Sequence, residues 1–169
     1  MMKADVIIIG GGAIGNAAAY NLARNKMKVI LIEKDEIGIG ASSRNGGGIR
    51  QSARDPRELP LAMYGVKNLW PGLSEELGVN VEYRQSGNLR LGKTPEHMKI
   101  LEQIVSQGRK AGLELSIIGS KEARELCPAF SDQVIGASYC PTDGRGNPMK
   151  TTLGFYKKAR ELGAIFKTG

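Results

Sequence analysis

A glycine-rich hexapeptide near the amino terminus has the residue types and spacing of a phosphate-binding loop. Residues 10–15 read GGGAIG and match the pattern G-x-G-x-x-G. In this pattern the glycines permit a tight turn, close approach of the backbone to a pyrophosphate, and close packing of a helix on a strand. The following helix would direct its unpaired N–H groups and its positive dipole end at the phosphates. The predicted phosphate-binding residues are Gly10, Gly12, Ala13, Ile14 and Gly15.

An acidic residue stands where such a site binds a ribose. Glu33 follows the glycine motif by about 20 residues and ends the next apolar run. A carboxylate at this point accepts hydrogen bonds from ribose hydroxyls and repels a 2′-phosphate, which argues against NADP. The motif and the acid do not by themselves decide between FAD and NAD.

The elements around this site form a predicted strand, helix and strand. The β-branched run at 6–9 is typical of a buried parallel strand, and residues 17–23 are strong helix formers. A second apolar run follows at 28–32. A crossover of this length places the two strands parallel and right-handed, so the sequence predicts a Rossmann-like βαβ unit.

The remaining sequence alternates between loop, helix and strand signals. Five glycines in the thirteen residues 38–50 indicate a loop. Thr94 and Pro95 indicate a helix start, and Pro148 indicates another. Helices are also expected at 57–70, 73–77 and after Ser120, a hairpin at 81–84 with 88–91, and strands at 113–118, 134–139 and 164–166.

Two segments resemble a known family. The run DVIIIGGGAIGNAAAYNLARNKMKVILIEKDEIGIGASSRNGGGIR (5–50) and the segment CPTDGRGNPMKTT (140–152) are similar to the amino-terminal portion of the FAD-dependent amine and amino acid oxidoreductases. That family includes sarcosine oxidase and its beta subunit, glycine oxidase, D-amino acid oxidase, and the beta subunits of dye-linked proline and hydroxyproline dehydrogenases. The resemblance therefore implies FAD as the cofactor.

The same resemblance implies a domain organisation. The expected fold class is α/β, with a Rossmann-like dinucleotide-binding βαβ unit, an inserted α+β portion of a substrate domain, and a fold left incomplete at the carboxyl terminus. The expected parts are an FAD-binding βαβ unit and flavin loop at 1–78, part of the substrate domain at 79–146, and a return helix with the start of a strand at 147–169.

Further site residues are implied by the family's pattern. In the family the loop after the second strand runs along the flavin, and Arg50 matches an arginine that binds the substrate carboxylate. A guanidinium suits this role because it offers a planar bidentate fork. No catalytic residue can be placed on this chain. Besides the glycine motif and Glu33, the expected cofactor-binding residues are Lys34, Ser42, Ser43, Arg44, Asn45, Gly46 and Gly47.

The implied activity is oxidation of the C–N bond of a small amino or imino acid, such as sarcosine, glycine, proline or hydroxyproline, by hydride transfer to flavin. This mechanism needs no protein nucleophile. The chain alone is expected to be inactive, with the missing carboxyl-terminal half or a second subunit as its partner. Two alternatives remain open: a non-catalytic truncated fragment that needs a partner chain, and an NAD-binding dehydrogenase module.

Composition excludes several other classes. The formal charge is +7, but the basic residues occur as short pairs and aromatic residues make up only 5%, so no nucleic-acid partner is expected. No apolar stretch has the roughly 20 residues that a membrane span needs, and no secretory segment is recognised, which predicts a cytoplasmic protein. With one histidine, His97, no metal site is expected.

Overall fold

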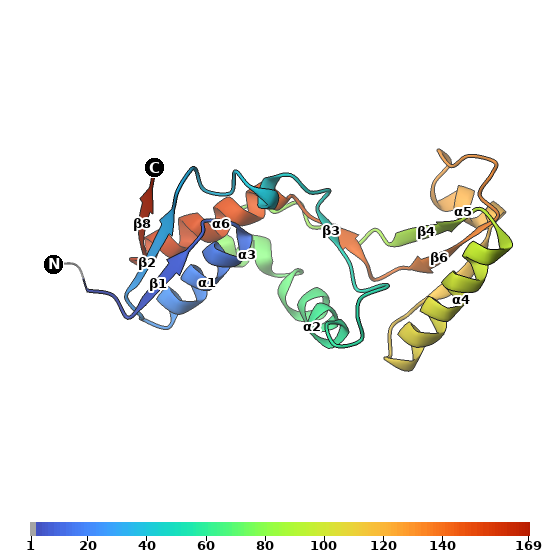
Figure 1. Cartoon of the computed structure of the whole chain (residues 1–169), viewed down its shortest axis with the longest axis horizontal. Helices are drawn as coiled ribbons and strands as arrows, with labels where there is room; N and C mark the ends of the chain where they lie inside the picture. The colour runs from blue at the N-terminus through green and yellow to red at the C-terminus, as the bar shows by residue number, and fades with distance from the viewer. Residues whose placement is uncertain (1–2) are drawn as a thin grey trace. The chain divides into compact units, whose positions relative to one another are not determined.

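The computed structural model describes residues 3–169, which divide into two compact units (Figure 1). The first unit contains the described residues up to Gly47 together with Gly72–Tyr83 and Gly146–Gly169. The second contains Gly48–Pro71 and Arg84–Arg145. Each unit is therefore built from segments that are far apart in the sequence.

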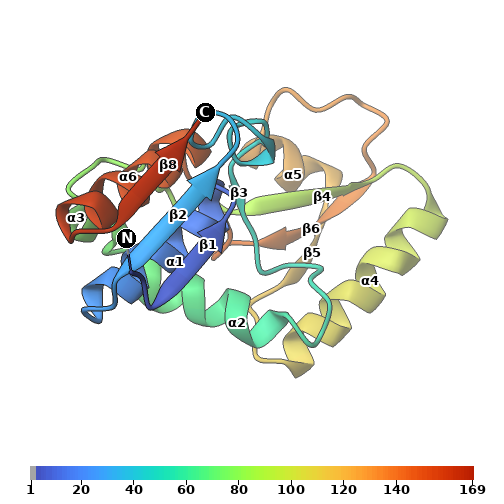
Figure 2. The same ribbon diagram turned by 60° about the vertical axis from the view of Figure 1, so that its left-hand side comes forward.

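The first unit is a parallel sheet with its helices packed on one face. The strand order is β1-β2-β8, and both pairings are parallel (Figure 2). This confirms the predicted α/β class with its βαβ start. The elements of this unit are β1 (Val6–Ile9), α1 (Ala13–Arg24), β2 (Val29–Glu33), the short 3-10 helix η1 (Ala41–Ser43), α3 (Leu73–Leu77), α6 (Pro148–Glu161) and β8 (Ile165–Thr168).

Small side chains allow the helices of this unit to pack closely on the sheet. Ala19 of α1 and Ala159 of α6 are fully buried against Leu31 of β2, which is also fully buried. Alternate residues along a strand point to opposite faces, so the neighbours of Leu31 on its own strand face away from both helices. The core of the unit therefore lies between the sheet and the α1–α6 layer.

The opposite face of this sheet is apolar and exposed within the part of the chain that the structure describes. Ile7 is 62% exposed and Ile9 is 88% exposed, and Ile32 and Ile165 are exposed beside them. Register pairs Ile9 with Ile32, so the isoleucines form adjacent rows on one face. Parallel sheets are ordinarily covered on both faces, whereas within residues 3–169 only the face toward α1 and α6 is covered.

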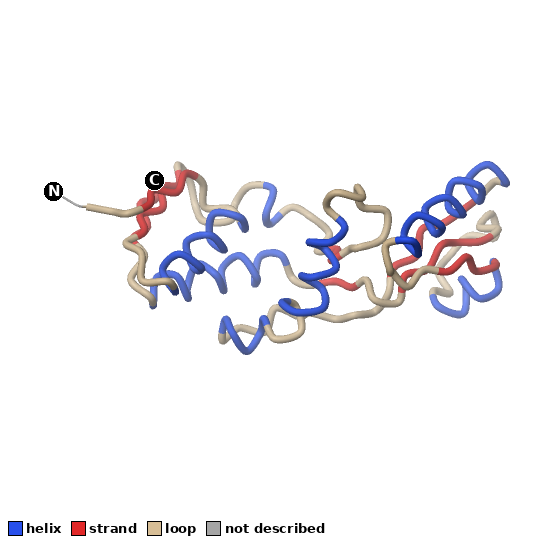
Figure 3. The backbone as a smooth tube through the Cα atoms, turned by 90° about the horizontal axis from the view of Figure 1, so that it is seen from below, coloured by secondary structure: helices blue, strands red, loops and turns tan. Residues whose placement is uncertain are grey.

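The second unit is an antiparallel sheet between two helices. The strand order is β4-β6-β5. Cys140 of β6 joins a buried cluster with Val105 of α4, whereas Ala137 of the same strand joins another with Ala123 of α5. The two helices therefore cover opposite faces of the sheet, as Figure 3 shows. The elements are β3 (Gly48–Ile49), α2 (Leu59–Tyr64), the π-helical turn η2 (Gly65–Leu69), β4 (Asn88–Gly92), α4 (Pro95–Lys110), β5 (Ser116–Gly119), α5 (Ser120–Leu126), β6 (Gly136–Cys140) and β7 (Gly144–Arg145).

Both long helices begin with a side-chain cap, and the first of these confirms the predicted Thr94 cap. Thr94 caps α4 by accepting a hydrogen bond from the N–H of His97 at 3.2 Å. Asn147 caps α6 in the same way, accepting from the N–H of Lys150 at 3.0 Å. Each helix then continues with proline in its first turn, where the missing N–H has no intrahelical partner to lose.

The predicted hairpin of 81–84 with 88–91 is wrong. Strand β4 pairs with β6 instead, with Leu89 opposite Tyr139. The segment before it cannot form a regular ladder, because Glu82 has φ of +56° and the carbonyl of Val81 accepts from Asn147 N at 2.8 Å. Strand β4 thus pairs with a strand distant in the sequence, and not with the neighbouring segment that the turn residues suggested.

The predicted domain ranges stay a prediction. The compact units differ from them at three places, since 48–71 groups with the second unit, whereas 79–83 and Gly146 group with the first. Among residues 3–169, no helix is both long enough and apolar enough to cross a membrane.

Leu31→Ala should destabilise the chain by about 2–5 kcal/mol, because it leaves a cavity under α1 and α6 where the side chain is fully buried. The measurement is the free energy of unfolding in urea. Leu61→Ala is the matched control, since Leu61 is 77% exposed and its truncation should change stability by less than about 0.5 kcal/mol. Equal losses in the two variants would contradict this description of the core.

Candidate dinucleotide-binding site

The glycine loop joins β1 to α1 with no space for side chains at its closest point. Gly10 continues the strand, since its N–H donates to the carbonyl of Ile32 at 2.8 Å, and its φ of +103° is one that other residues rarely adopt. A Cβ built on Gly15 would lie 2.0 Å from the Gly10 carbonyl oxygen. The two glycines therefore allow the helix to begin directly against the end of the strand.

The amino terminus of α1 is open to an anion. Gly12 is the N-cap and supplies no capping side chain, and the first N–H groups of a helix have no intrahelical acceptor. One of them, the N–H of Ala13, donates to Ser42 Oγ at 2.8 Å. The remaining first-turn N–H groups and the helix dipole favour a phosphate at this end.

Asn16, which the sequence pattern did not single out, fixes the glycine loop through hydrogen bonds to its backbone. Its side chain is fully buried and its Nδ2 donates to the carbonyls of Gly11 at 2.6 Å and Gly12 at 2.8 Å. These bonds hold the carbonyl oxygens of the loop toward the helix. An asparagine in the first turn of a helix that follows a glycine motif was the available signal, because amide side chains commonly bind nearby backbone.

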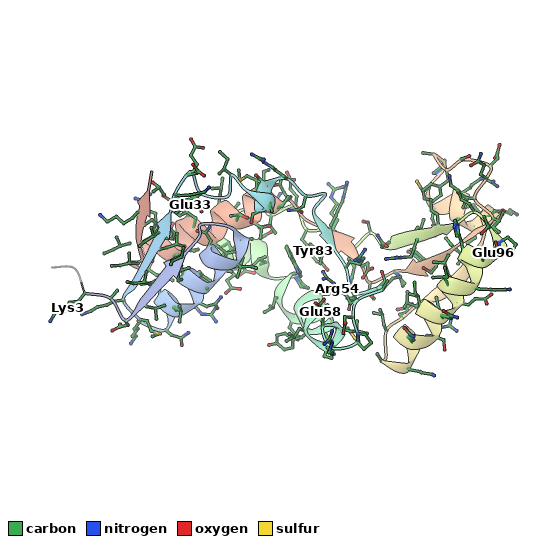
Figure 4. The ribbon with its side chains drawn as sticks, viewed as in Figure 1. Lys3, Glu33, Arg54, Glu58, Tyr83 and Glu96 are labelled. Carbon is green, nitrogen blue, oxygen red and sulfur yellow. The ribbon has the colours of Figure 1, made fainter. Side chains whose placement is uncertain are left out.

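Glu33 lies beside the glycine loop, at the carboxyl end of β2 (Figure 4). One carboxylate oxygen accepts from Asp35 N at 3.0 Å and the other from Gly11 N at 2.6 Å. These two N–H donors hold the pKa of Glu33 below its usual range, because they stabilise the ionised form. Lys34, by contrast, is exposed and its ammonium lies 3.7 Å from Asp35.

The predicted flavin loop folds back onto the same helix end. Ser42 binds Ala13 as described, and Ser43 Oγ donates to the Gly40 carbonyl at 3.2 Å. Asn45 is used within the loop: its Nδ2 donates to Ala41 and Ser42 carbonyls, and its Oδ1 accepts from Gly47 N at 2.9 Å.

The other residues of this loop differ in exposure. Arg44 and Gly46 are exposed. Gly47 is buried, and a Cβ there would lie 2.1 Å from the Gly146 carbonyl oxygen. The structure thus brings Ser42 and Glu33 to the glycine loop, while the cofactor contacts of the remaining predicted residues stay predictions.

Arg50 belongs to the second unit. Its side chain is exposed, and within residues 3–169 its guanidinium has no hydrogen-bond or ion-pair partner. Its assignment to substrate binding stays a prediction.

The glycine loop, the open helix end and Glu33 are the parts of a dinucleotide site, and comparison with known proteins identifies the type. Residues 5–169 match the family model described as FAD dependent oxidoreductase. The chain belongs to this family. The match confirms the family resemblance seen in the sequence, and it favours FAD over the NAD-binding alternative.

Solved structures of family members share the fold. L-proline dehydrogenase from P. horikoshii is 35% identical with a TM-score of 0.89, and 98% of this chain covers 44% of that one. Glycine oxidase from Geobacillus kaustophilus is 29% identical with a TM-score of 0.92, and 99% of this chain covers 47% of that one. Among curated relatives, mitochondrial dimethylglycine dehydrogenase of Rattus norvegicus is 31% identical over 98% of this chain and 19% of its own length. The chain thus spans less than half the length of these relatives.

FAD is the cofactor of this family, and the residues present fit it. Side chains are absent where a pyrophosphate must approach, since Gly10 and Gly12 lie between the strand and the helix end. Each oxygen of the Glu33 carboxylate has lone pairs besides the one that accepts from the backbone, and these can accept from ribose hydroxyls.

Glu33→Gln should weaken the dependence of stability on pH. In the folded chain the pKa of Glu33 is lowered, so its ionised form stabilises the fold above the ordinary value of about 4.3. That stabilisation is lost as pH falls through the lowered pKa. The free energy of unfolding between about pH 6 and pH 3 should therefore fall less steeply in the variant. Glu102→Gln on α4, an exposed residue, is the control; an unchanged slope in Glu33→Gln would contradict the prediction.

Gly15→Ala should reduce FAD affinity at least about tenfold, because its Cβ would displace the Gly10 carbonyl and with it the loop. FAD bound per polypeptide after purification and dialysis is the measurement. Gly65→Ala is the control, since a Cβ there meets nothing within 4 Å and the backbone is helical. Full FAD content in Gly15→Ala would show that this close approach is not needed.

Proposed function

We propose that the chain is the FAD-binding part of an enzyme that oxidises the C–N bond of a small amino or imino acid. The observation that carries this proposal is the assembly of the glycine loop, Ser42 and Glu33 at one end of α1, in a chain of the FAD dependent oxidoreductase family. The names of its relatives refer to proline, glycine and dimethylglycine. All three are small molecules with a nitrogen on the carbon next to a carboxylate.

Bound FAD supplies a two-electron acceptor for the hydride of the substrate carbon. The work of this chain is binding and orientation. The amino terminus of α1 neutralises pyrophosphate charge with N–H groups and the helix dipole, and Glu33 holds the ribose through its carboxylate oxygens. The link between Ser42 and Ala13 holds the following loop at the helix end, which supports its proposed place along the flavin.

Arg50 is the proposed binding residue for the substrate carboxylate. A guanidinium presents two parallel N–H donors to the two oxygens of a carboxylate, and that of Arg50 has no acceptor in the described residues. Because no carboxylate among the described residues pairs with this guanidinium, it is available to bind the carboxylate of a ligand. A substrate held by its carboxylate has its α-carbon and nitrogen in a fixed orientation.

Turnover is proposed to need further polypeptide. The structural relatives are more than twice as long as the part that this chain covers, at 44% and 47%. The remaining part, whether it continues the chain or comes from a second subunit, is proposed to supply the rest of the substrate pocket and the route to the electron acceptor. The alternative is that the chain functions only as a non-catalytic fragment, which predicts FAD binding without turnover in any assembly.

The test is anaerobic reduction of the flavin in the complete enzyme, followed by its visible absorption band. Small amino and imino acids, with sarcosine, glycine and L-proline first, should bleach the band. An enzyme that holds FAD but is reduced by none of a broad panel of these acids would overturn the proposed substrate class.

Arg50→Ala in the complete enzyme should raise the KM for the amino acid by about 30-fold or more, because a charge-assisted bidentate pair is lost. The kcat should change less. Arg57→Ala is the control, since its guanidinium is already paired with Asp55 at 2.8 Å. An unchanged KM in Arg50→Ala would remove this residue from the substrate site.

A further inference from the structure

Asp143 is a fully buried acidic residue whose carboxylate is held by hydrogen bonds and not by a cation of the described chain. It follows β6, and within residues 3–169 no lysine, arginine or histidine nitrogen lies within ion-pair distance of its carboxylate. Burying an unpaired carboxylate is costly unless hydrogen bonds stabilise it.

The donors come from two consecutive residues about ninety positions earlier. Gln51 N donates to Oδ1 at 2.7 Å, and Ser52 donates to Oδ2 through its N–H at 3.3 Å and its hydroxyl at 2.5 Å. Ala53 follows in the left-handed region with φ of +52°. Successive N–H groups that converge on one anion beside a left-handed residue form an anion-binding nest. Here the anion is a side chain of the same unit.

The nest fixes the backbone on one side of Arg50, and a strand pairing fixes it on the other. Ile49 pairs with Gly144 in the short β3–β7 ladder, and the carbonyl of Arg50 itself accepts from Arg54 Nε at 3.1 Å. In addition, Gln51 Nε2 donates to the Thr142 hydroxyl at 3.0 Å. The backbone of residues 49–52 is therefore held by the turn that contains Asp143.

The two arginines of this segment differ in what they bind. Arg54 is engaged, since its Nε binds the Arg50 carbonyl and its NH1 lies 3.5 Å from Glu58 (Figure 4). The guanidinium of Arg50 has no such partner in the described chain. A fixed backbone that carries an uncommitted guanidinium is the arrangement that gives a binding residue a defined position before its ligand arrives.

We propose that Asp143 is a positioning residue for Arg50, so that the buried carboxylate determines how well the enzyme recognises the carboxylate of its substrate. This inference rests on the proposed function of Arg50. It also explains why an aspartate, and not its neutral amide, stands in the turn: an amide group would turn an N–H toward donors that require an acceptor.

The experiment compares matched ligands with and without a carboxylate on the complete enzyme. The pairs are L-proline with pyrrolidine and sarcosine with dimethylamine. The readout is the KM of the acid and the KM, or the inhibition constant where no turnover occurs, of the amine. Asp143→Asn should raise the KM of the acid about tenfold and change the constant of the amine by no more than about twofold. A general structural defect would affect the acid and the amine alike.

Two further variants separate positioning from loss of folding. Ser52→Ala removes one donor and leaves the two N–H bonds, so it should give a smaller shift with the same selectivity. Asp132→Asn makes the same change of charge at a fully exposed site of the same unit and should leave both constants unchanged.

A double-mutant cycle then tests the route of the effect. If Asp143 acts through Arg50, Asp143→Asn should cause no further loss of selectivity in an Arg50→Ala background. Additive losses of selectivity in the double variant would overturn the inference. It would also be overturned if Asp143→Asn and Ser52→Ala each raised the constants of the acid and the amine equally. If the wild-type enzyme oxidises amino acids and Arg50→Ala leaves the KM unchanged, the proposed role of Arg50 is overturned. If the wild-type enzyme oxidises no amino acid, the proposed function itself is overturned.

Discussion

The contact of the Gly15 backbone with the Gly10 carbonyl is the constraint on which the dinucleotide site depends. No side chain fits between them, so the first turn of α1 begins at the end of β1. Everything else at the site is positioned from this contact. Asn16 can reach the loop carbonyls and Ser42 can reach Ala13 because the helix starts where it does. A few ångströms of displacement would separate the helix dipole from the phosphates that it is to stabilise.

Backbone N–H groups have opposite uses at the start of α1 and in the nest around Asp143. At the start of α1, backbone N–H groups are left open and form a site for an external anion. In the nest at residues 51–52, backbone N–H groups are occupied by the protein's own carboxylate, Asp143. The first arrangement is suited to direct binding of a phosphate. The second gives rigidity to a segment whose exposed arginine is available for one.

Local features of the sequence predicted the parts of the fold that form from neighbouring residues. The β1–α1–β2 unit, the helix starts at Thr94 and Pro148 and the place of Glu33 all follow from patterns within a few tens of residues. The pairing of β4 with β6 and the ladder of β3 with β7 did not, because partners so distant leave no periodic signal in either strand. Asn16 and Asp143 were not predicted for a related reason. Both bind backbone groups, and because every residue has such groups, the sequence does not show which positions are bound.

The strand order β1-β2-β8 has a consequence for how the chain folds during synthesis. The central strand β2 has one neighbour at residues 6–9 and the other at 165–168, so the first unit cannot complete its sheet until almost all of these residues have left the ribosome. The α4–β6 region, whose contacts are more local, is synthesised entirely before that point. Since contacts of high sequence separation form slowly, the first unit is expected to complete its fold after the second, although β1 precedes every element of the second unit.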